Sequence, residues 1–141
     1  MYKRILVATD GTKLSKNAVD SAISLAGLTG AQLVALKVVP RYPQSYFEGS
    51  LPVATEEVAR VEKQWEGEAR ACVNEVKALA KAQGVTAKAV TSKSDLVAES
   101  IIAAATKHQC DLIVMASHGR RGLKRLLLGS ETQHVLTHSS I

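Results

Sequence analysis

The sequence predicts an α/β protein with a single doubly wound parallel sheet and helices on both faces. The first observation is a set of short, almost continuous apolar runs, which are typical of strands covered on both faces. The second is that apolar residues recur at helical spacing between those runs. With 141 residues, 46% of them hydrophobic, the chain is long enough for one domain, residues 1–141, with its own core.

Four strands are predicted along the chain. Apolar runs place three of them at residues 5–8, 33–39 and 112–115. Residues 85–90 alternate between apolar and polar types. We therefore expect this strand to be half-exposed and nearer the edge of the sheet.

Helices fill the intervals between the strands. Apolar periodicity predicts them over residues 18–26, 58–80 and 96–105, and a last helix begins near Glu131. Polar caps and terminal glycines mark the helix ends: Ser15 before the first helix, Gly27 or Gly30 after it, Gly84 after the second, and Ser94 before the third.

The charge of the chain favours a small anionic partner. The formal net charge is +5 and the pI is about 9.4. Basic residues gather in one glycine-containing stretch: Arg120, Arg121, Lys124 and Arg125. A phosphate ligand suits this cluster better than a nucleic-acid duplex, which needs a basic stripe and a recognition element. No apolar run approaches the roughly 18 to 20 residues that span a bilayer, so we expect a cytoplasmic protein without a membrane partner.

Cysteines and histidines show no spacing typical of a metal site. Cys72 and Cys110 lie among apolar neighbours, which predicts small buried thiols, with a disulfide or redox role as the alternative. His134 and His138 lie four residues apart without a glutamate between them, which favours a surface pair over metal ligands. We therefore assign no metal ligand.

Residues 116–130 have the composition of a phosphate-binding loop. A strand leads into the stretch, its glycines allow the backbone to approach a ligand, and it ends at a helix N-terminus with free amide donors. Ser130 has two interpretations. Its hydroxyl binds a phosphate, or it forms a capping box with Gln133.

Asp10 follows the first strand at the edge of the sheet where a doubly wound fold binds ligands. Its carboxylate could accept hydrogen bonds from ribose hydroxyls, bind a metal, or cap the next helix. The residues themselves leave these three roles open.

Familiar enzyme motifs are missing from the sequence. It has no G-x-x-x-x-G-K-[ST] and no G-x-G-x-x-G after the first strand, which argues against a Walker-type NTPase and a dinucleotide dehydrogenase. Its histidines lack an associated carboxylate and nucleophile. We therefore expect a binding protein that is not an enzyme.

The chain resembles the universal stress protein family over residues 2–139. The resemblance rests on the first strand ending in Thr9-Asp10, on the strand 111–115, and above all on a nucleotide motif. That motif is a Gly, two residues, a Gly, nine residues, and then Gly with Ser or Thr. Its positions in this chain are Ala116, Gly119, Gly129 and Ser130. The resemblance implies a Rossmann-like sheet with a strand order similar to 3-2-1-4-5.

The resemblance also implies a pocket for ATP or AMP, with Mg²⁺ as an option beside ATP. Slow ATP hydrolysis in this pocket is an open alternative to binding alone, because Asp10 and Mg²⁺ would lie near the phosphates. In ATP-binding members, the acid matching Asp10 lies at the ribose and the backbone matching Val38 holds adenine. The remaining implied contacts are Thr9, Met115 and Ala116 along the wall, and Gly119, Gly129, Ser130, Thr132 and the amide of Glu131 around the phosphates. The basic cluster adds Arg120 as an expected phosphate contact.

The chain departs from the family pattern at two places. The first motif glycine is Ala116, whose methyl group could crowd the ribose. The short closing strand that family members use, often to pair across a dimer, has no counterpart before Ile141. We still expect a homodimer that acts on an unidentified protein partner. The alternative function is a nucleotide-free dimeric stress scaffold.

Overall fold

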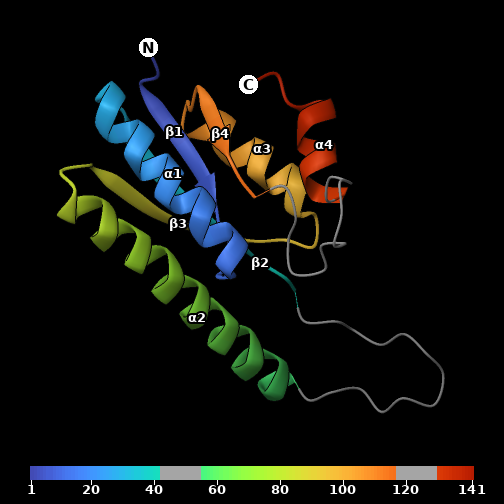
Figure 1. Ribbon diagram of the computed structural model, residues 1–141. Coiled ribbons are helices and arrows are strands. Elements are labelled where there is room, and N and C mark those ends of the chain that lie inside the picture. Colours follow the sequence, from blue (N-terminus) through green and yellow to red (C-terminus); the bar gives the residue numbers. More distant parts are fainter. Residues whose placement is uncertain (42–54, 117–129) are drawn as a thin grey trace.

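The computed structural model describes residues 1–41, 55–116 and 130–141, and strands alternate with helices throughout (Figure 1). In chain order the elements are β1 (Arg4–Ala8), α1 (Lys13–Thr29), β2 (Gln32–Val39), α2 (Thr55–Ala82), β3 (Ala87–Lys93), α3 (Val97–Lys107), β4 (Leu112–Val114) and α4 (Ser130–His138). The predicted α/β class is confirmed.

The strands form one parallel sheet with the order β3-β2-β1-β4. This order agrees with the first four positions of the expected 3-2-1-4-5 arrangement, and the described residues contain no fifth strand. β3 is an edge strand and is partly exposed along its length, as its alternating sequence predicts. Because the strands are parallel, their carboxyl ends meet at one edge of the sheet.

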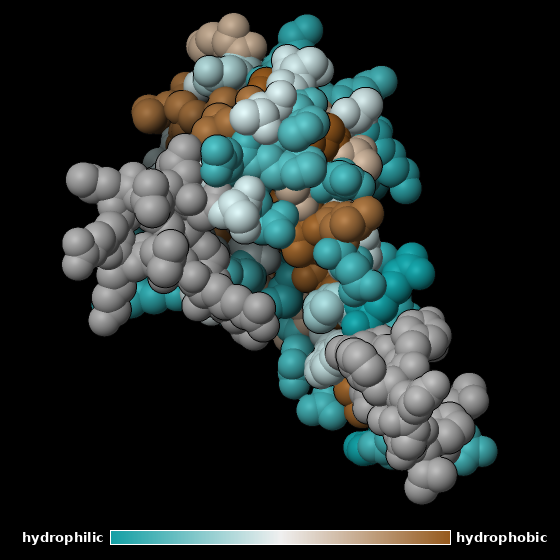
Figure 2. Space-filling model, turned by 90° about the vertical axis from the view of Figure 1, so that its right-hand side faces the viewer, coloured by the Kyte–Doolittle hydropathy of each residue, from teal (hydrophilic) through white to brown (hydrophobic). Residues whose placement is uncertain are grey.

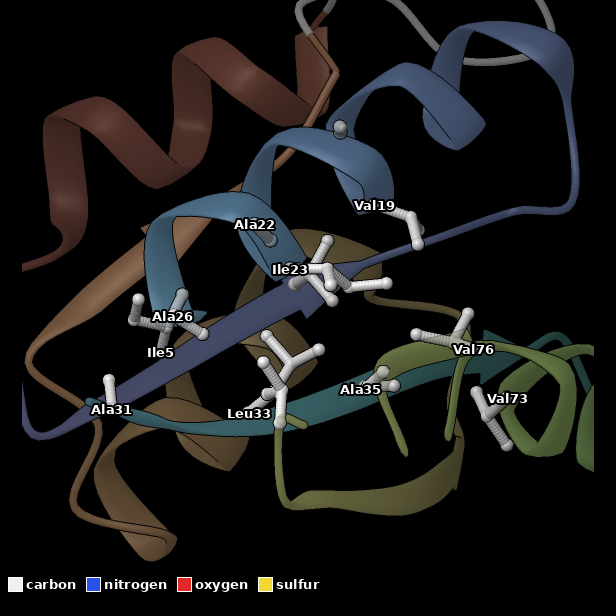
Figure 3. Packing of buried hydrophobic residues seen from close by; sticks show 14 residues of the cluster. Ile5, Val19, Ala22, Ile23, Ala26, Ala31, Leu33, Ala35, Val73 and Val76 are labelled. Carbon is white, nitrogen blue, oxygen red and sulfur yellow. The ribbon is translucent and has the colours of Figure 1, made fainter. Parts of the chain in front are cut away.

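Successive strand residues point to opposite faces of the sheet, so each face has its own core. On one face, Ile5 and Leu33 pack against α1 and α2, where Ile23 and Val73 cover them (Figure 3). All of these side chains are almost fully buried. This core fixes α1 and the turn before it relative to the sheet.

The opposite face carries α3 and α4. Leu6 and Leu36 pack there against Ile101 of α3 and Val135 of α4. The helices therefore cover both faces, as the continuous apolar runs of β1 and β2 predict.

The predicted cap of the first helix at Ser15 is wrong. The N-cap is Thr12, whose hydroxyl accepts a hydrogen bond from the Ser15 N–H at 3.3 Å. Ser15 is buried because its hydroxyl bonds inward, to the turn before the helix. At the other end, Gly30 adopts a φ of 71° and terminates α1, which confirms it as the end of the helix.

The predicted cap at Ser94 is also wrong. α3 begins at Val97, and the Ser94 hydroxyl accepts the Leu96 N–H at 3.0 Å in the turn before the helix. β3 begins two residues later than predicted, because the Val85 N–H bonds the Ala80 carbonyl at the end of α2. That bond keeps Val85 out of the sheet ladder.

Both cysteines are free thiols, but their burial differs. Cys110 is buried, as predicted. The prediction of a buried thiol is wrong for Cys72, which is only partly buried on α2. Its sulfur lies at the margin of the core, close to Gly11 in the turn after β1.

The exposed apolar side chains are spread over the fold. Leu28 of α1, Leu96 before α3 and Leu136 of α4 are more than half exposed. On the side of the molecule in Figure 2, hydrophilic side chains divide the hydrophobic surface into separate patches. Among the described helices, none has the length and apolar character needed to cross a membrane.

Candidate functional site

A tight turn of residues 9–12 leaves the carboxyl end of β1 at the switch point of the sheet. The strand order reverses between β1 and β4, and doubly wound sheets bind ligands at such points. Oδ1 of Asp10 accepts the Thr12 N–H at 2.9 Å and the Thr12 hydroxyl at 2.5 Å. Gly11 has a φ of 80°, a left-handed conformation that glycine adopts without strain.

Buried hydroxyl groups attach this turn to α1. Oγ1 of Thr9 and Oγ of Ser15 lie 3.1 Å apart, and both residues are buried. The Ser15 hydroxyl also donates to the Thr12 carbonyl at 2.9 Å, and the Gly11 N–H donates to Thr9 Oγ1 at 3.2 Å. The shape of the turn therefore results from contacts within the chain.

The Asp10 carboxylate is held in its ionised form. Burial acts to raise the pKa of Asp10, but hydrogen bonds from Thr12 and Ser15 and the charge of Lys37 outweigh it, so the pKa lies below its usual value. An ionised carboxylate offers about four acceptor positions. Thr12 occupies two of them, both on Oδ1, and Ser15 contributes a further hydrogen bond, which still leaves acceptor capacity for a hydroxyl donor.

Lys37 is a residue of this site that the sequence analysis missed. It lies in β2, and its Nζ donates to the Asp10 carbonyl at 3.0 Å. The signal in the sequence is a single lysine inside the apolar run 33–39. Thr12 was not predicted either, although hydroxyl residues commonly shape turns after strands.

Val38 presents backbone groups beside the end of β1. The Leu36 carbonyl accepts the Thr9 N–H at 2.9 Å, where β1 ends. Backbone groups alternate between the two edges of a strand, so the N–H and C=O of Val38 point to the same side as those of Leu36. No backbone partner meets them there within residues 1–41, 55–116 and 130–141. They are therefore available for hydrogen bonding at this edge of the sheet.

The first turn of α4 is anchored at the same edge of the sheet. Thr132 is buried, and its hydroxyl donates to the Ala116 carbonyl at 2.9 Å. The Glu131 carboxylate accepts the Ala98 N–H at 3.0 Å and so caps the first turn of α3. The family resemblance implies a role for the Glu131 amide, whereas this role of its carboxylate was not predicted.

The predicted site residues divide into three groups. Thr9, Asp10, Val38, Met115 and Ala116 lie at or just beyond the carboxyl ends of β1, β2 and β4, and Ser130, Glu131 and Thr132 form the first turn of α4. Gly119, Arg120 and Gly129 lie outside the described residues, as does the rest of the basic cluster. The fold brings the first two groups to one edge of the sheet.

An open groove of about 320 Å³ runs between α1 and β4. Met115 and Ala116 line it together with Leu14 of α1, whereas Asp10 and Val38 do not. The groove and the Asp10 turn are therefore separate features.

The described residues contain no cluster of three or more His, Cys, Asp or Glu side chains suited to a metal ion. His134 and His138 stack on α4 with their ring centroids 4.2 Å apart. Thr137 Oγ1 lies 2.8 Å from His138 Nδ1, so the second ring is held by a neighbouring hydroxyl.

The sheet order and the acidic turn at the switch point define a Rossmann-like α/β protein, a class of fold that binds ligands at this edge of the sheet. The chain belongs to the universal stress protein family, whose model matches residues 1–141. A universal stress protein of Methanocaldococcus jannaschii is 34% identical to it over 142 residues, which cover 99% of this chain and 78% of that protein.

Solved structures show the same fold. A universal stress protein in complex with cAMP is 27% identical, with a TM-score of 0.69, and the match covers 99% of this chain and 92% of that one. A family protein of Arabidopsis thaliana with AMP bound is 13% identical, with a TM-score of 0.68 over 98% of this chain and 86% of that one. At that identity the second likeness concerns the fold alone.

Proposed function

We propose that this protein binds an adenine nucleotide, ATP or AMP, at the carboxyl edge of its sheet and acts as a stress-response regulator. Asp10 binds the ribose, the backbone of Val38 binds adenine, and Thr9, Met115 and Ala116 form the wall. The related protein in complex with cAMP supports an adenine nucleotide as the ligand class.

One observation carries this proposal. An ionised carboxylate is fixed in a turn at the switch point, at the same edge as the backbone groups of Val38, which meet no backbone partner among the described residues. Such an arrangement offers acceptors to sugar hydroxyls and a donor and an acceptor to a base. Because bonds within the chain already hold the turn, binding a ligand does not require the turn to become ordered.

The phosphates would lie at the N-terminus of α4. Ser130 and the Glu131 amide are in its first turn, where unpaired N–H groups and the helix dipole favour an anion. Gly119, Arg120 and Gly129 complete the proposed phosphate contacts, and Mg²⁺ would accompany ATP. The Thr132 hydroxyl donates to the Ala116 carbonyl, so it must change partner to bind a phosphate.

We propose regulation by the bound nucleotide in place of catalysis. A general base works best when its pKa lies near the working pH. The pKa of Asp10 is lowered from an ordinary value that is already acidic, because the Thr12 and Ser15 hydrogen bonds and the Lys37 charge outweigh burial. This carboxylate suits hydrogen bonding better than proton abstraction from water. The liganded state would be read by a second copy of the chain or by a protein partner.

Equilibrium titration with AMP, with ATP and Mg²⁺, and with GMP as the control for the base tests the proposal. We expect saturable binding of the adenine nucleotides and weaker binding of GMP. Amide NMR signals of Thr12, Val38 and Glu131 should shift on addition of AMP, whereas those of Gly30, at the opposite edge, should not.

The absence of binding by any of these nucleotides at millimolar concentration would favour the alternative, a nucleotide-free dimeric scaffold. Sedimentation of the ligand-free protein then measures whether it forms the homodimer that the alternative requires.

A further inference from the structure

We propose that Lys37 is a positioning residue of the site, whose ammonium group holds the Asp10 carbonyl and thereby sets the direction of the Asp10 carboxylate. This inference rests on the proposed nucleotide function, because the ribose is the group that Asp10 would bind. Lys37 acts through Asp10 and makes no contact with the ligand itself.

Lys37 occupies a strand position whose neighbours on the same face are core residues. Leu33 and Ala35 of β2 are almost fully buried beneath α1 and α2, and Lys37 follows them at the same two-residue spacing. Lys37 is partly buried. Its alkyl chain covers apolar surface while its ammonium group reaches the carboxyl edge of the sheet. There the Nζ donates to the Asp10 carbonyl at 3.0 Å.

This contact links two strands at the point where the turn begins. In the part of the chain that the structure describes, every other hydrogen bond of residues 10–12 comes from residues 9–16. Lys37 is 27 residues from Asp10 in the sequence. It therefore ties a locally formed turn to β2, where the proposed base contact at Val38 lies.

The ammonium group lies directly beneath the turn. A Cβ atom placed on Gly11 would be 3.9 Å from the Lys37 Nζ and 3.8 Å from the Cys72 sulfur. With a neutral, apolar side chain at position 37, the Asp10 carbonyl would lose its donor. Residues 10–12 would then lose their direct bond to β2, and only the Thr9 N–H, at the start of the turn, would still bond the Leu36 carbonyl.

The charge of Lys37 is available to Asp10. No carboxylate forms an ion pair with Lys37 in the described residues. Its positive charge favours the ionised carboxylate of Asp10. An ammonium group has three donors, and the Asp10 carbonyl takes one of them.

Three variants separate positioning from a general effect of charge. Lys37→Met removes the donor and the charge but keeps an unbranched side chain, and Lys37→Arg keeps both. Lys13→Met is the matched control, because Lys13 is an exposed residue at the start of α1, next to the same turn. The dissociation constants of AMP and 2′-deoxy-AMP are measured for each variant.

We expect Lys37→Met to weaken AMP on the order of tenfold and 2′-deoxy-AMP far less, because the second ligand lacks one of the hydroxyls that Asp10 would bind. Lys37→Arg should restore most of the affinity for AMP. Lys13→Met should change both constants by about twofold or less, since exposed charges are screened. Equal weakening of both ligands by Lys37→Met, or no weakening, would overturn the proposal.

A second measurement needs no nucleotide. The Thr12 amide donates to Asp10 Oδ1, so its hydrogen exchange reports on the turn in the ligand-free protein. We expect exchange on the order of tenfold faster in Lys37→Met, relative to amides of β2, and unchanged exchange in Lys13→Met. If wild type binds no adenine nucleotide, the proposed function fails. The exchange rate then decides by itself whether Lys37 positions the turn, and an unchanged rate means that it does not.

Discussion

The amino and carboxyl edges of the sheet, where the parallel strands begin and end, each carry an aspartate with a lowered pKa. The two carboxylates have different partners. At the amino edge, Asp111 accepts the N–H groups of Lys3 at 2.9 Å and Arg4 at 3.1 Å, more than a hundred residues away in the sequence. The Lys3 bond is the main cause of the lowered pKa of Asp111. At the carboxyl edge, Asp10 bonds Thr12, two residues away.

The two aspartates differ in how far their bonding partners lie from them in the sequence, and this difference indicates their structural roles. Asp111 joins β1 to the start of β4, and the Arg4 guanidinium extends this link by donating to the His108 carbonyl at 2.7 Å. These contacts hold elements together. Asp10 shapes a turn and keeps further acceptor positions, so the same residue type stabilises the fold at one edge and forms the proposed binding group at the other.

The largest expected effects come from removing each of the two aspartates in turn. Asp10→Ala should weaken AMP on the order of tenfold or more, because a hydrogen bond to a charged group is lost from the site. Asp111→Ala should lower the thermal midpoint while leaving AMP affinity unchanged, because its partners are strand ends. Calorimetry and thermal unfolding of both proteins check this crossed pattern. A loss of affinity in Asp111→Ala would contradict the division between the edges.

Glycines with positive φ give a smaller effect that sharpens the same comparison. Gly11→Ala and Gly30→Ala should each destabilise the protein by about 1 kcal/mol, because alanine is strained at φ values of 80° and 71°. Neither new methyl group would meet an atom closer than 3.8 Å. Urea unfolding should show similar losses of unfolding free energy for the two variants. Only Gly11→Ala should also weaken AMP, by several-fold, and an equal effect of Gly30→Ala on affinity would argue against a local role of the turn.

The smallest effect concerns pH at the amino edge. Burial, and then the charges of Lys88, Lys107 and Arg4, lower the pKa of His108 from its ordinary value. As pH falls below about 6.5, the unfolded chain binds this proton before the folded one does, so the folded state loses stability down to the lowered pKa. His108→Gln should remove this part of the pH dependence. Unfolding free energies of both proteins between pH 7.5 and about pH 5 measure the difference, and parallel curves would contradict the shift.

Much of the fold could be predicted from local patterns in the sequence. The apolar runs of β1 and β2 indicate strands buried on both faces, and the alternation near β3 indicates an edge strand. The helix caps were less predictable. Ser15 and Thr12 are both hydroxyl residues near the start of α1, and the sequence alone allows either to cap it. In the structure Ser15 bonds the Thr9 hydroxyl, and Thr12 is the cap.

The candidate site was predictable in part. Asp10 follows from its place after the first strand, and Val38 from the family resemblance alone. The role of Lys37 was not, because a lysine in an apolar run identifies no partner by itself. The Glu131 carboxylate likewise bonds the start of α3, 33 residues earlier in the chain.

The sequence by itself determined the alternation of strands and helices and the aspartate at the end of β1, because periodicity and turn chemistry act over a few neighbouring residues. The tertiary structure decided which polar side chains meet at each edge. Those contacts join residues far apart in the sequence, such as Lys37 and Asp10, or Asp111 and Arg4. The pairing of parallel strands and the packing of the helices between them bring these residues together in space.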